Sequence, residues 1–302
     1  MPSQKLISTP LGSQSKAHLY ALGTVLLWST VSTAFKLALA KASVLLVFTY
    51  AMLFASVILF LYLLLKKEIS LLFSLSGKEY CSCFLLSCML FLYYNCLFIG
   101  YTGLPVQIAQ PINYAWTIML ALLGCLILKQ SLKQREIFWI LFAFIGVVII
   151  STGNASTVKE ENSLSLFCIF LSTFLYALYW IYNTKNPLPS NIKLFLGFFG
   201  AGLLGLSTLL FQQETLLWPQ SALLPTCYIG LFELSIPFLL WDKAILYTKS
   251  ISKIATIPLI SPFLALLWAQ CILGEQIQFI NIIGLLFIVF GIFMQQKTKN
   301  DR

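Results

Sequence analysis

The sequence predicts an all-α integral membrane protein with ten transmembrane helices, arranged as two inverted five-helix repeats. Three observations lead to this fold. The 302 residues are 59% hydrophobic and 10% charged, whereas soluble domains are about half apolar and about a quarter charged. Ten apolar segments that can be drawn as spanning helices follow one another, and the fifth of them is short. The second half of the chain also repeats the apolar pattern of the first.

The segments are defined by their length, because a spanning helix needs about 20 mainly apolar residues to satisfy its backbone inside lipid. They run over residues 17–40, 43–65, 80–101, 104–128, 137–152, 163–182, 194–211, 221–244, 250–273 and 278–295. The chain therefore divides into a cytoplasmic tail (1–16), a first repeat (17–152), an outer linker (153–162), a second repeat (163–295) and a cytoplasmic tail (296–302).

The basic residues indicate the orientation. If both termini are cytoplasmic, all of the 19 Lys and Arg residues except Lys36, Lys41 and Lys159 lie in inner segments or at the helix ends that flank them. This bias follows the positive-inside rule for short loops. The net charge of +9 is thus explained by topology, and no nucleic-acid partner is expected.

The internal repeat appears when residues 117–150 are placed over residues 262–295 without a gap. Apolar positions coincide, and Gly146 falls on Gly291. Since each half holds five helices, the second half must enter the membrane in the opposite orientation. Inverted repeats of this kind place the substrate near the midplane between the halves. Small residues at Gly197, Gly200, Gly202, Gly205, Gly284 and Gly291 predict close helix contacts.

Several function classes are excluded by composition. His18 is the only histidine, so a histidine triad or a histidine metal cluster cannot be built from this chain alone. The eight cysteines show no CxxC spacing and are interpreted as packing residues. No Walker A loop is present to bind ATP. The sequence therefore predicts no metal, no cofactor and no enzyme activity, and it leaves the oligomeric state open.

Glu233 is the first candidate for a functional residue, because a bare carboxylate near the middle of a spanning helix costs several kcal/mol. It should face the bundle interior and pair, protonate or bind a cation; a simple interhelical contact is the alternative. Pro237 cannot donate to the carbonyl of Glu233, which leaves an acceptor free beside the carboxylate. Trp241 lies on the same helix face.

Other polar and aromatic side chains share helix faces. Tyr176, Tyr179 and Trp180 form a face that could stack on a planar or cationic ligand, or serve packing. Lys36 either contacts a carboxylate or extends to the outer headgroups. The predicted substrate-binding residues are Trp28, Ser32, Lys36, Tyr94, Gln107, Gln110, Tyr114, Tyr176, Tyr179, Trp180, Glu233, Trp241 and Ser261.

Three stretches resemble the EamA-like branch of the drug/metabolite transporter superfamily. They are residues 27–36 (LWSTVSTAFK), 112–117 (INYAWT) and 261–275 (SPFLALLWAQCILGE). The resemblance covers nearly the whole chain and implies ten helices and a central cavity with alternating access. In the first half the proline and the closing Gly-Glu of the family pattern are replaced by Thr117 and Lys129-Gln130.

The resemblance favours a secondary transporter for a small organic metabolite in the bacterial inner membrane, with the lipid bilayer as its other partner. Some members of the superfamily carry aromatic amino acids. Others, in chlamydiae, exchange S-adenosylmethionine for S-adenosylhomocysteine, and the Lys-rich, Cys-rich character of this sequence is similar to theirs. S-adenosylmethionine uptake is therefore the preferred prediction, and amino-acid export is the alternative. A membrane enzyme acting on lipid and a non-transporting receptor subunit are the remaining alternatives.

Overall fold

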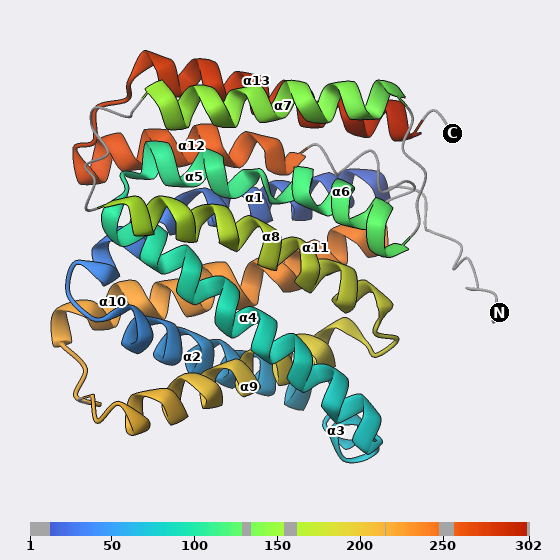
Figure 1. Ribbon diagram of the computed structural model, residues 1–302. Coiled ribbons are helices and arrows are strands. Elements are labelled where there is room, and N and C mark those ends of the chain that lie inside the picture. The colour runs from blue at the N-terminus through green and yellow to red at the C-terminus, as the bar shows by residue number, and fades with distance from the viewer. Residues whose placement is uncertain (1–12, 129–133, 154–161, 215, 248–256, 301–302) are drawn as a thin grey trace.

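The computed structural model describes residues 13–128, 134–153, 162–214, 216–247 and 257–300, and all regular elements in these ranges are helical (Figure 1). The first half contains α1 (Ser13–Leu39), α2 (Val44–Leu65), α3 (Ser70–Phe73), α4 (Gly77–Gly103), α5 (Val106–Tyr114), α6 (Trp116–Leu128) and α7 (Gln134–Gly153). The second half contains α8 (Ser163–Lys185), α9 (Ser190–Phe211), α10 (Gln220–Ile229), η2 (Gly230–Ser235), α11 (Ile236–Tyr247), η4 (Ile257–Ile260), α12 (Ser261–Trp268), η5 (Ala269–Leu273) and α13 (Phe279–Asn300).

Each of the ten predicted segments contains helix. Within the described ranges, six helices are long and apolar enough to cross a membrane: 14–39, 44–65, 77–103, 163–185, 190–211 and 220–244. Shorter apolar helices cover 137–150, 261–273 and 279–295. Residues 154–161 of the predicted linker, residues 250–256 of the ninth segment and Lys129-Gln130 lie outside the described residues. The chain is thus a multi-pass helical protein, and the exact number of spans remains a prediction.

Three of the predicted segments are interrupted rather than continuous. Residues 104–128 are broken at Ala115, whose N–H donates to the carbonyl of Ile112 at 2.9 Å in a tighter turn. Residues 220–247 pass through the π-helical turn η2, and residues 257–273 end in the π-helical turn η5. After η5, Gly274 adopts a positive φ of 69°, a conformation that glycine adopts without strain.

The main packing contacts join the two halves of the chain. α1 packs on α11, α4 on α8, α2 on α9, and α7 on α13. Figure 1 shows α7 and α13 side by side along one edge of the bundle, with α2 and α9 toward the opposite edge. The halves therefore interlock instead of forming separate domains.

Glycines allow two of these pairs to approach closely, as the sequence predicts. A Cβ atom on Gly202 would lie 2.8 Å from the side chain of Leu53, so α9 and α2 are in backbone-to-side-chain contact. A Cβ atom on Gly291 would lie 2.8 Å from the backbone nitrogen of Ala143, on α7. Small residues at such positions let helix backbones pack tightly in the absence of water.

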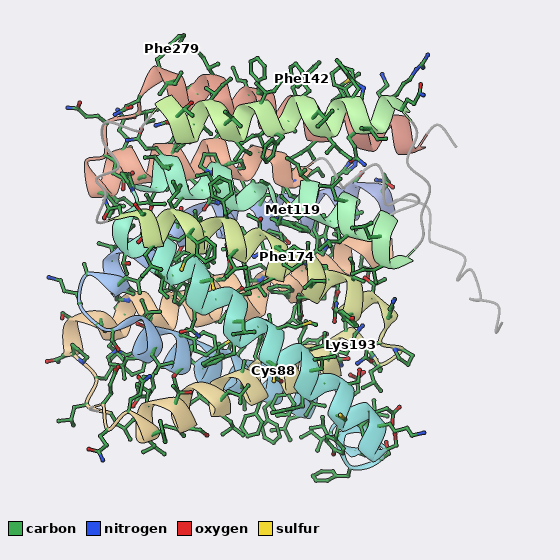
Figure 2. The ribbon with its side chains drawn as sticks, in the orientation of Figure 1. Cys88, Met119, Phe142, Phe174, Lys193 and Phe279 are labelled. Carbon is green, nitrogen blue, oxygen red and sulfur yellow. The ribbon has the colours of Figure 1, made fainter. Side chains whose placement is uncertain are left out.

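Large apolar side chains cover the outside of the bundle. Phe211 and Phe279 are 88% and 75% exposed, and Figure 2 shows Phe279 at the outer edge beside α13. An exposed apolar surface of this extent is unfavourable in water and suits contact with lipid.

Candidate substrate site

Glu233 lies in the π-helical turn η2, between α10 and α11. Its side chain is partly buried. The hydroxyl of Tyr94, on α4 in the first half, donates a hydrogen bond of 3.1 Å to carboxylate Oε1 of Glu233. Tyr94 itself is 1% exposed. The predicted acidic residue is therefore held at the junction of the two halves, by a neutral donor.

The backbone of Glu233 is also bound by the first half. Pro237 has no N–H to donate to the Glu233 carbonyl, and that oxygen accepts a 3.3 Å hydrogen bond from the indole Nε1 of Trp28. The hydroxyl of Thr24 lies 3.3 Å from the carbonyl of Pro237 and donates to it. α1 thus supplies the donors for backbone acceptors near the proline. The sequence predicted the free carbonyl of Glu233 but gave no indication of its partner.

Aromatic rings connect Trp28 back to Tyr94 through both halves of the chain. Successive ring centroids lie 5.8 Å apart for Trp28 and Phe238, 6.3 Å for Phe238 and Trp180, 5.9 Å for Trp180 and Tyr176, 4.2 Å for Tyr176 and Tyr93, and 4.5 Å for Tyr93 and Tyr94. Together with Glu233, these six residues form a closed series of contacts, which we call the aromatic circuit.

Further aromatic residues extend the aromatic circuit. Trp116, at the start of α6, lies 5.0 Å from Tyr176 and 6.3 Å from Trp180 between ring centroids. The ring of Tyr179 is stacked on Tyr176 at 6.0 Å, and Trp241 lies 6.3 Å from Trp28. The predicted residues Tyr176, Tyr179, Trp180, Trp28 and Trp241 therefore belong to one continuous group of rings.

Ser32 and Ser261 are predicted site residues that are almost fully buried, at 1% and 0% exposure. Ser32 lies on α1 one turn after Trp28. Its Oγ atom has no hydrogen-bond partner within the described part of the chain. A buried hydroxyl without a partner is uncommon, and it is the kind of group that a ligand or a bound water satisfies. Ser261 begins α12.

The polar side chains predicted on one face of α5 form hydrogen bonds with other parts of the protein. The side-chain oxygen of Gln107 accepts hydrogen bonds from Gln278 N at 2.9 Å and from Asn281 Nδ2 at 2.8 Å. The side-chain oxygen of Gln110 accepts one from the hydroxyl of Tyr101. Tyr114 donates to the carbonyl of Pro258 at 3.4 Å. These contacts join α5 to the second half and to α4, and they do not bring Gln107 or Gln110 into the aromatic circuit.

Lys36 also binds backbone groups of the protein. Its ammonium donates to the carbonyls of Tyr101 and Leu104, at 2.9 Å and 3.0 Å, where α4 ends. The opposite charge of the Glu275 carboxylate favours the charged form of this ammonium. Lys36 therefore points to helix-end carbonyls instead of outer headgroups, and direct contact with a carboxylate stays a prediction.

A second ammonium binds helix-end carbonyls at the opposite end of the bundle. Lys193 Nζ donates to the carbonyls of Asn183 and Asn186 at 2.9 Å and 3.2 Å, where α8 ends. Figure 2 shows Lys193 toward the end of the bundle that holds α3. The half-buried Lys36 and the buried Lys193 are thus both bound to backbone carbonyls, and the carboxylate of Glu233 remains the charged group of the aromatic circuit.

Three members of the site were missed by the sequence analysis. Tyr93, Trp116 and Phe238 were not among the predicted substrate-binding residues. Trp116 directly follows the break in the helix at Ala115, and Phe238 directly follows Pro237. Aromatic residues next to helix breaks are therefore the signal that could have identified them.

The arrangement combines one carboxylate with the faces and edges of several aromatic rings. A cation over an aromatic face is attracted by the ring quadrupole, and planar groups stack on such rings. The chemistry of the site therefore suits a solute that has a positive charge and a flat ring system.

Comparison with known proteins gives a consistent result. The EamA-like transporter family matches residues 15–152 and residues 163–295. A protein of Clostridium kluyveri described as an uncharacterized transporter is 28% identical over 196 residues, which cover 58% of this chain and 59% of that protein. The chain thus spans about three fifths of this relative's length. A crystal structure described only as that of a protein has a TM-score of 0.69 and 16% identity, over 95% of this chain and 99% of that one.

Proposed function

Because the chain belongs to the EamA-like transporter family, which makes it a multi-pass membrane transporter, we propose that it carries a cationic, ring-bearing metabolite between its two halves. The transport is secondary and proceeds by alternating access. The observation that supports this most directly is the aromatic circuit, in which Glu233 of the second half is held by Tyr94 and Trp28 of the first. Relative movement of the halves would change the contacts around a solute bound there.

The proposed topology has ten spans in two inverted halves, with both termini in the cytoplasm of a bacterial inner membrane. The packing pairs support it. In the proposed repeats α1 corresponds to α8, and α4 corresponds to α11. Exchanging the halves therefore converts the pair α1 and α11 into the pair α8 and α4, and both pairs are in contact. The same exchange leaves α2 with α9 and α7 with α13, which are also in contact. This is the pattern expected of two related halves around a two-fold axis.

The proposed substrate is S-adenosylmethionine, taken up in exchange for S-adenosylhomocysteine. Its sulfonium group is a fixed cation that suits the carboxylate of Glu233, and its adenine ring suits stacking in the aromatic circuit. The amino-acid part needs polar partners, and the buried Oγ of Ser32 is one group with free capacity. Aromatic amino acids satisfy the ring requirement and form the second candidate class of substrate.

Exchange in liposomes tests this proposal. The purified protein is reconstituted in liposomes loaded with unlabelled S-adenosylhomocysteine, and entry of labelled S-adenosylmethionine is measured. We expect entry that depends on the protein and on the internal substrate, and a loss of at least about tenfold in Glu233→Gln, because the amide lacks the charge. Glu214→Gln is the matched control, since Glu214 is exposed and accepts a hydrogen bond from Ser43 away from the aromatic circuit.

The outcomes separate the two substrate classes. Protein-dependent entry of labelled tryptophan or tyrosine, without entry of S-adenosylmethionine, would transfer the proposal to amino acids. Wild-type exchange by a correctly inserted Glu233→Gln protein would remove Glu233 from substrate binding. Absence of protein-dependent entry for a broad panel of labelled cations and amino acids would overturn the proposed substrate chemistry.

A further inference from the structure

The junction between α4 and α5 is a short turn at which backbone groups of two helix ends come close together. α4 ends at Gly103 and α5 begins at Val106. The last carbonyls of a helix and the first N–H groups of the next one have no partners inside their own helices. They also carry the negative and positive ends of the helix dipoles. The junction therefore requires donors for the end of α4 and acceptors for the start of α5.

Lys36 supplies the donors from α1. Its ammonium binds the carbonyls of Tyr101 and Leu104 at 2.9 Å and 3.0 Å, and both of those residues are 0% exposed. A cation at a helix C-terminus is stabilised by the dipole. Because the carbonyls are buried, no water replaces the ammonium while the junction stays packed.

Glu275 supplies the acceptors from the other half of the chain. Its Oε1 accepts a hydrogen bond from Val106 N at 3.0 Å, and its Oε2 accepts one from Gln107 N at 3.4 Å. Glu275 follows the π-helical turn η5 and Gly274, which together turn the chain back toward α5. The N-terminus of α5 is thus capped by a carboxylate from the second half.

Gln107 also joins the two halves, but here the acceptor belongs to the first half and the donors belong to the second. Its side-chain oxygen accepts hydrogen bonds from Gln278 N and from Asn281 Nδ2, close to the start of α13. Asn281 is 0% exposed. Four hydrogen bonds therefore cross between the halves at one end of the bundle, and the ammonium of Lys36 is attracted to the carboxylate that makes two of them.

We propose that Lys36 and Glu275 form a latch that holds this end of the transporter closed and releases when the end opens. The proposal rests on the proposed transport function and adds a gating device to it. Opening separates α5 from the segment around Glu275, so Glu275 loses its backbone partners Val106 N and Gln107 N, and both charged groups become hydrated. A pair of charges bound to helix ends suits this role, because water entering the opened end can solvate them and offset the broken contacts.

Thiol labelling tests the latch without any substrate. All eight cysteines are replaced by serine or alanine, and Ser32→Cys is introduced as a reporter, because Ser32 is buried one turn along α1 from Lys36. The rate of modification by a membrane-impermeant cationic methanethiosulfonate is measured in sealed vesicles of both orientations. We expect Glu275→Gln and Lys36→Met to raise the rate at least about tenfold, because each change removes or weakens two charge-assisted hydrogen bonds. The increase should occur only from the side that exposes residues 274–278.

Two controls distinguish a latch from a general loosening of the bundle. Lys36→Arg keeps a cationic donor for the carbonyls and should label close to the parent rate. Lys193→Met makes the same chemical change as Lys36→Met at the opposite end, and it should not raise labelling through the end that holds Glu275. An equal increase in all three methionine and glutamine variants, from both sides, would overturn the proposal.

Two further outcomes also overturn it. Equal labelling rates in the parent, Glu275→Gln and Lys36→Met would mean that the contacts do not limit opening. Failure of both variants to give monodisperse protein, with Lys36→Arg behaving normally, would assign the contacts to folding alone. Since labelling needs no solute, a result in favour of the latch stands even where the liposome exchange fails, and that combination would show an incorrect substrate assignment.

Discussion

The hydroxyl of Tyr94 donates a 3.1 Å hydrogen bond to the carboxylate of Glu233, and it does so across the boundary between the two halves of the chain. The two residues are 139 positions apart in the sequence. Tyr94 lies in an uninterrupted helix, whereas Glu233 lies in a π-helical turn. The donor therefore lies in regular α-helix, and the acceptor lies in a π-helical turn, a feature frequent at functional sites.

Tyr94→Phe removes this hydrogen bond and keeps the ring in the aromatic circuit. We expect exchange to fall about fivefold to tenfold, because the carboxylate loses the donor that orients it. The initial rate of exchange in liposomes measures the effect. Tyr182→Phe, on an exposed position of α8, is the matched control. Equal rates for the two variants would mean that the Tyr94 hydroxyl has no part in transport.

Trp28→Phe removes the indole N–H that binds the carbonyl of Glu233. A buried acceptor left without a partner costs about 1–3 kcal/mol, so the variant should unfold several degrees below the wild type in a thermal scan in detergent. Adding Pro237→Ala restores a backbone N–H four residues after Glu233. We therefore expect the double variant to recover part of the lost stability. Additive destabilisation by the two changes would argue against this account of the proline.

Trp180→Ala opens the aromatic circuit between Phe238 and Tyr176. Because base or ring stacking on one aromatic side chain contributes about 1 kcal/mol or more, the apparent KM should rise about fivefold or more. Vmax should change less. Trp139→Ala is the control, since Trp139 packs on Phe290 outside the aromatic circuit. A KM that stays at the wild-type value would assign the rings of α8 to packing.

Gly284→Ala tests the close contact between α7 and α13. The added Cβ would lie 2.8 Å from the carbonyl oxygen of Gly146, and a backbone atom cannot move aside easily. We expect a loss of about 1–3 kcal/mol, as for other overpacked contacts. Gly77→Ala meets no atom within 4 Å and should be close to neutral. Similar melting temperatures for both variants would contradict the close approach.

Hydropathy located ten apolar segments that each contain helix, because a lipid-facing chain must satisfy its backbone within each segment. The prediction for Glu233 and Pro237 also came from a local rule, since a proline always lacks the N–H that the fourth preceding carbonyl needs. The partners of these groups were beyond such rules. Trp28 is some 200 residues away from Glu233, and a long-range contact leaves no pattern in a single sequence.

The glutamines of α5 show a second limit. A polar helix face indicates burial inside a membrane protein, but it does not distinguish a solute from another helix. Gln107 was expected to bind substrate, which stays a prediction, and its side-chain oxygen accepts hydrogen bonds from Gln278 and Asn281. The π-helical turns were not predicted, because no pattern in the sequence distinguishes such a turn from regular helix.

The glycine contact between α7 and α13 restricts how the protein can move. These helices are the last of each half, and their backbones touch at Gly146, Gly284 and Gly291. Sliding one helix along the other would drive side chains such as Ile150 into backbone atoms. The two helices therefore form one rigid pair at the edge of the bundle. A relative rotation of the two halves has to pivot at this pair.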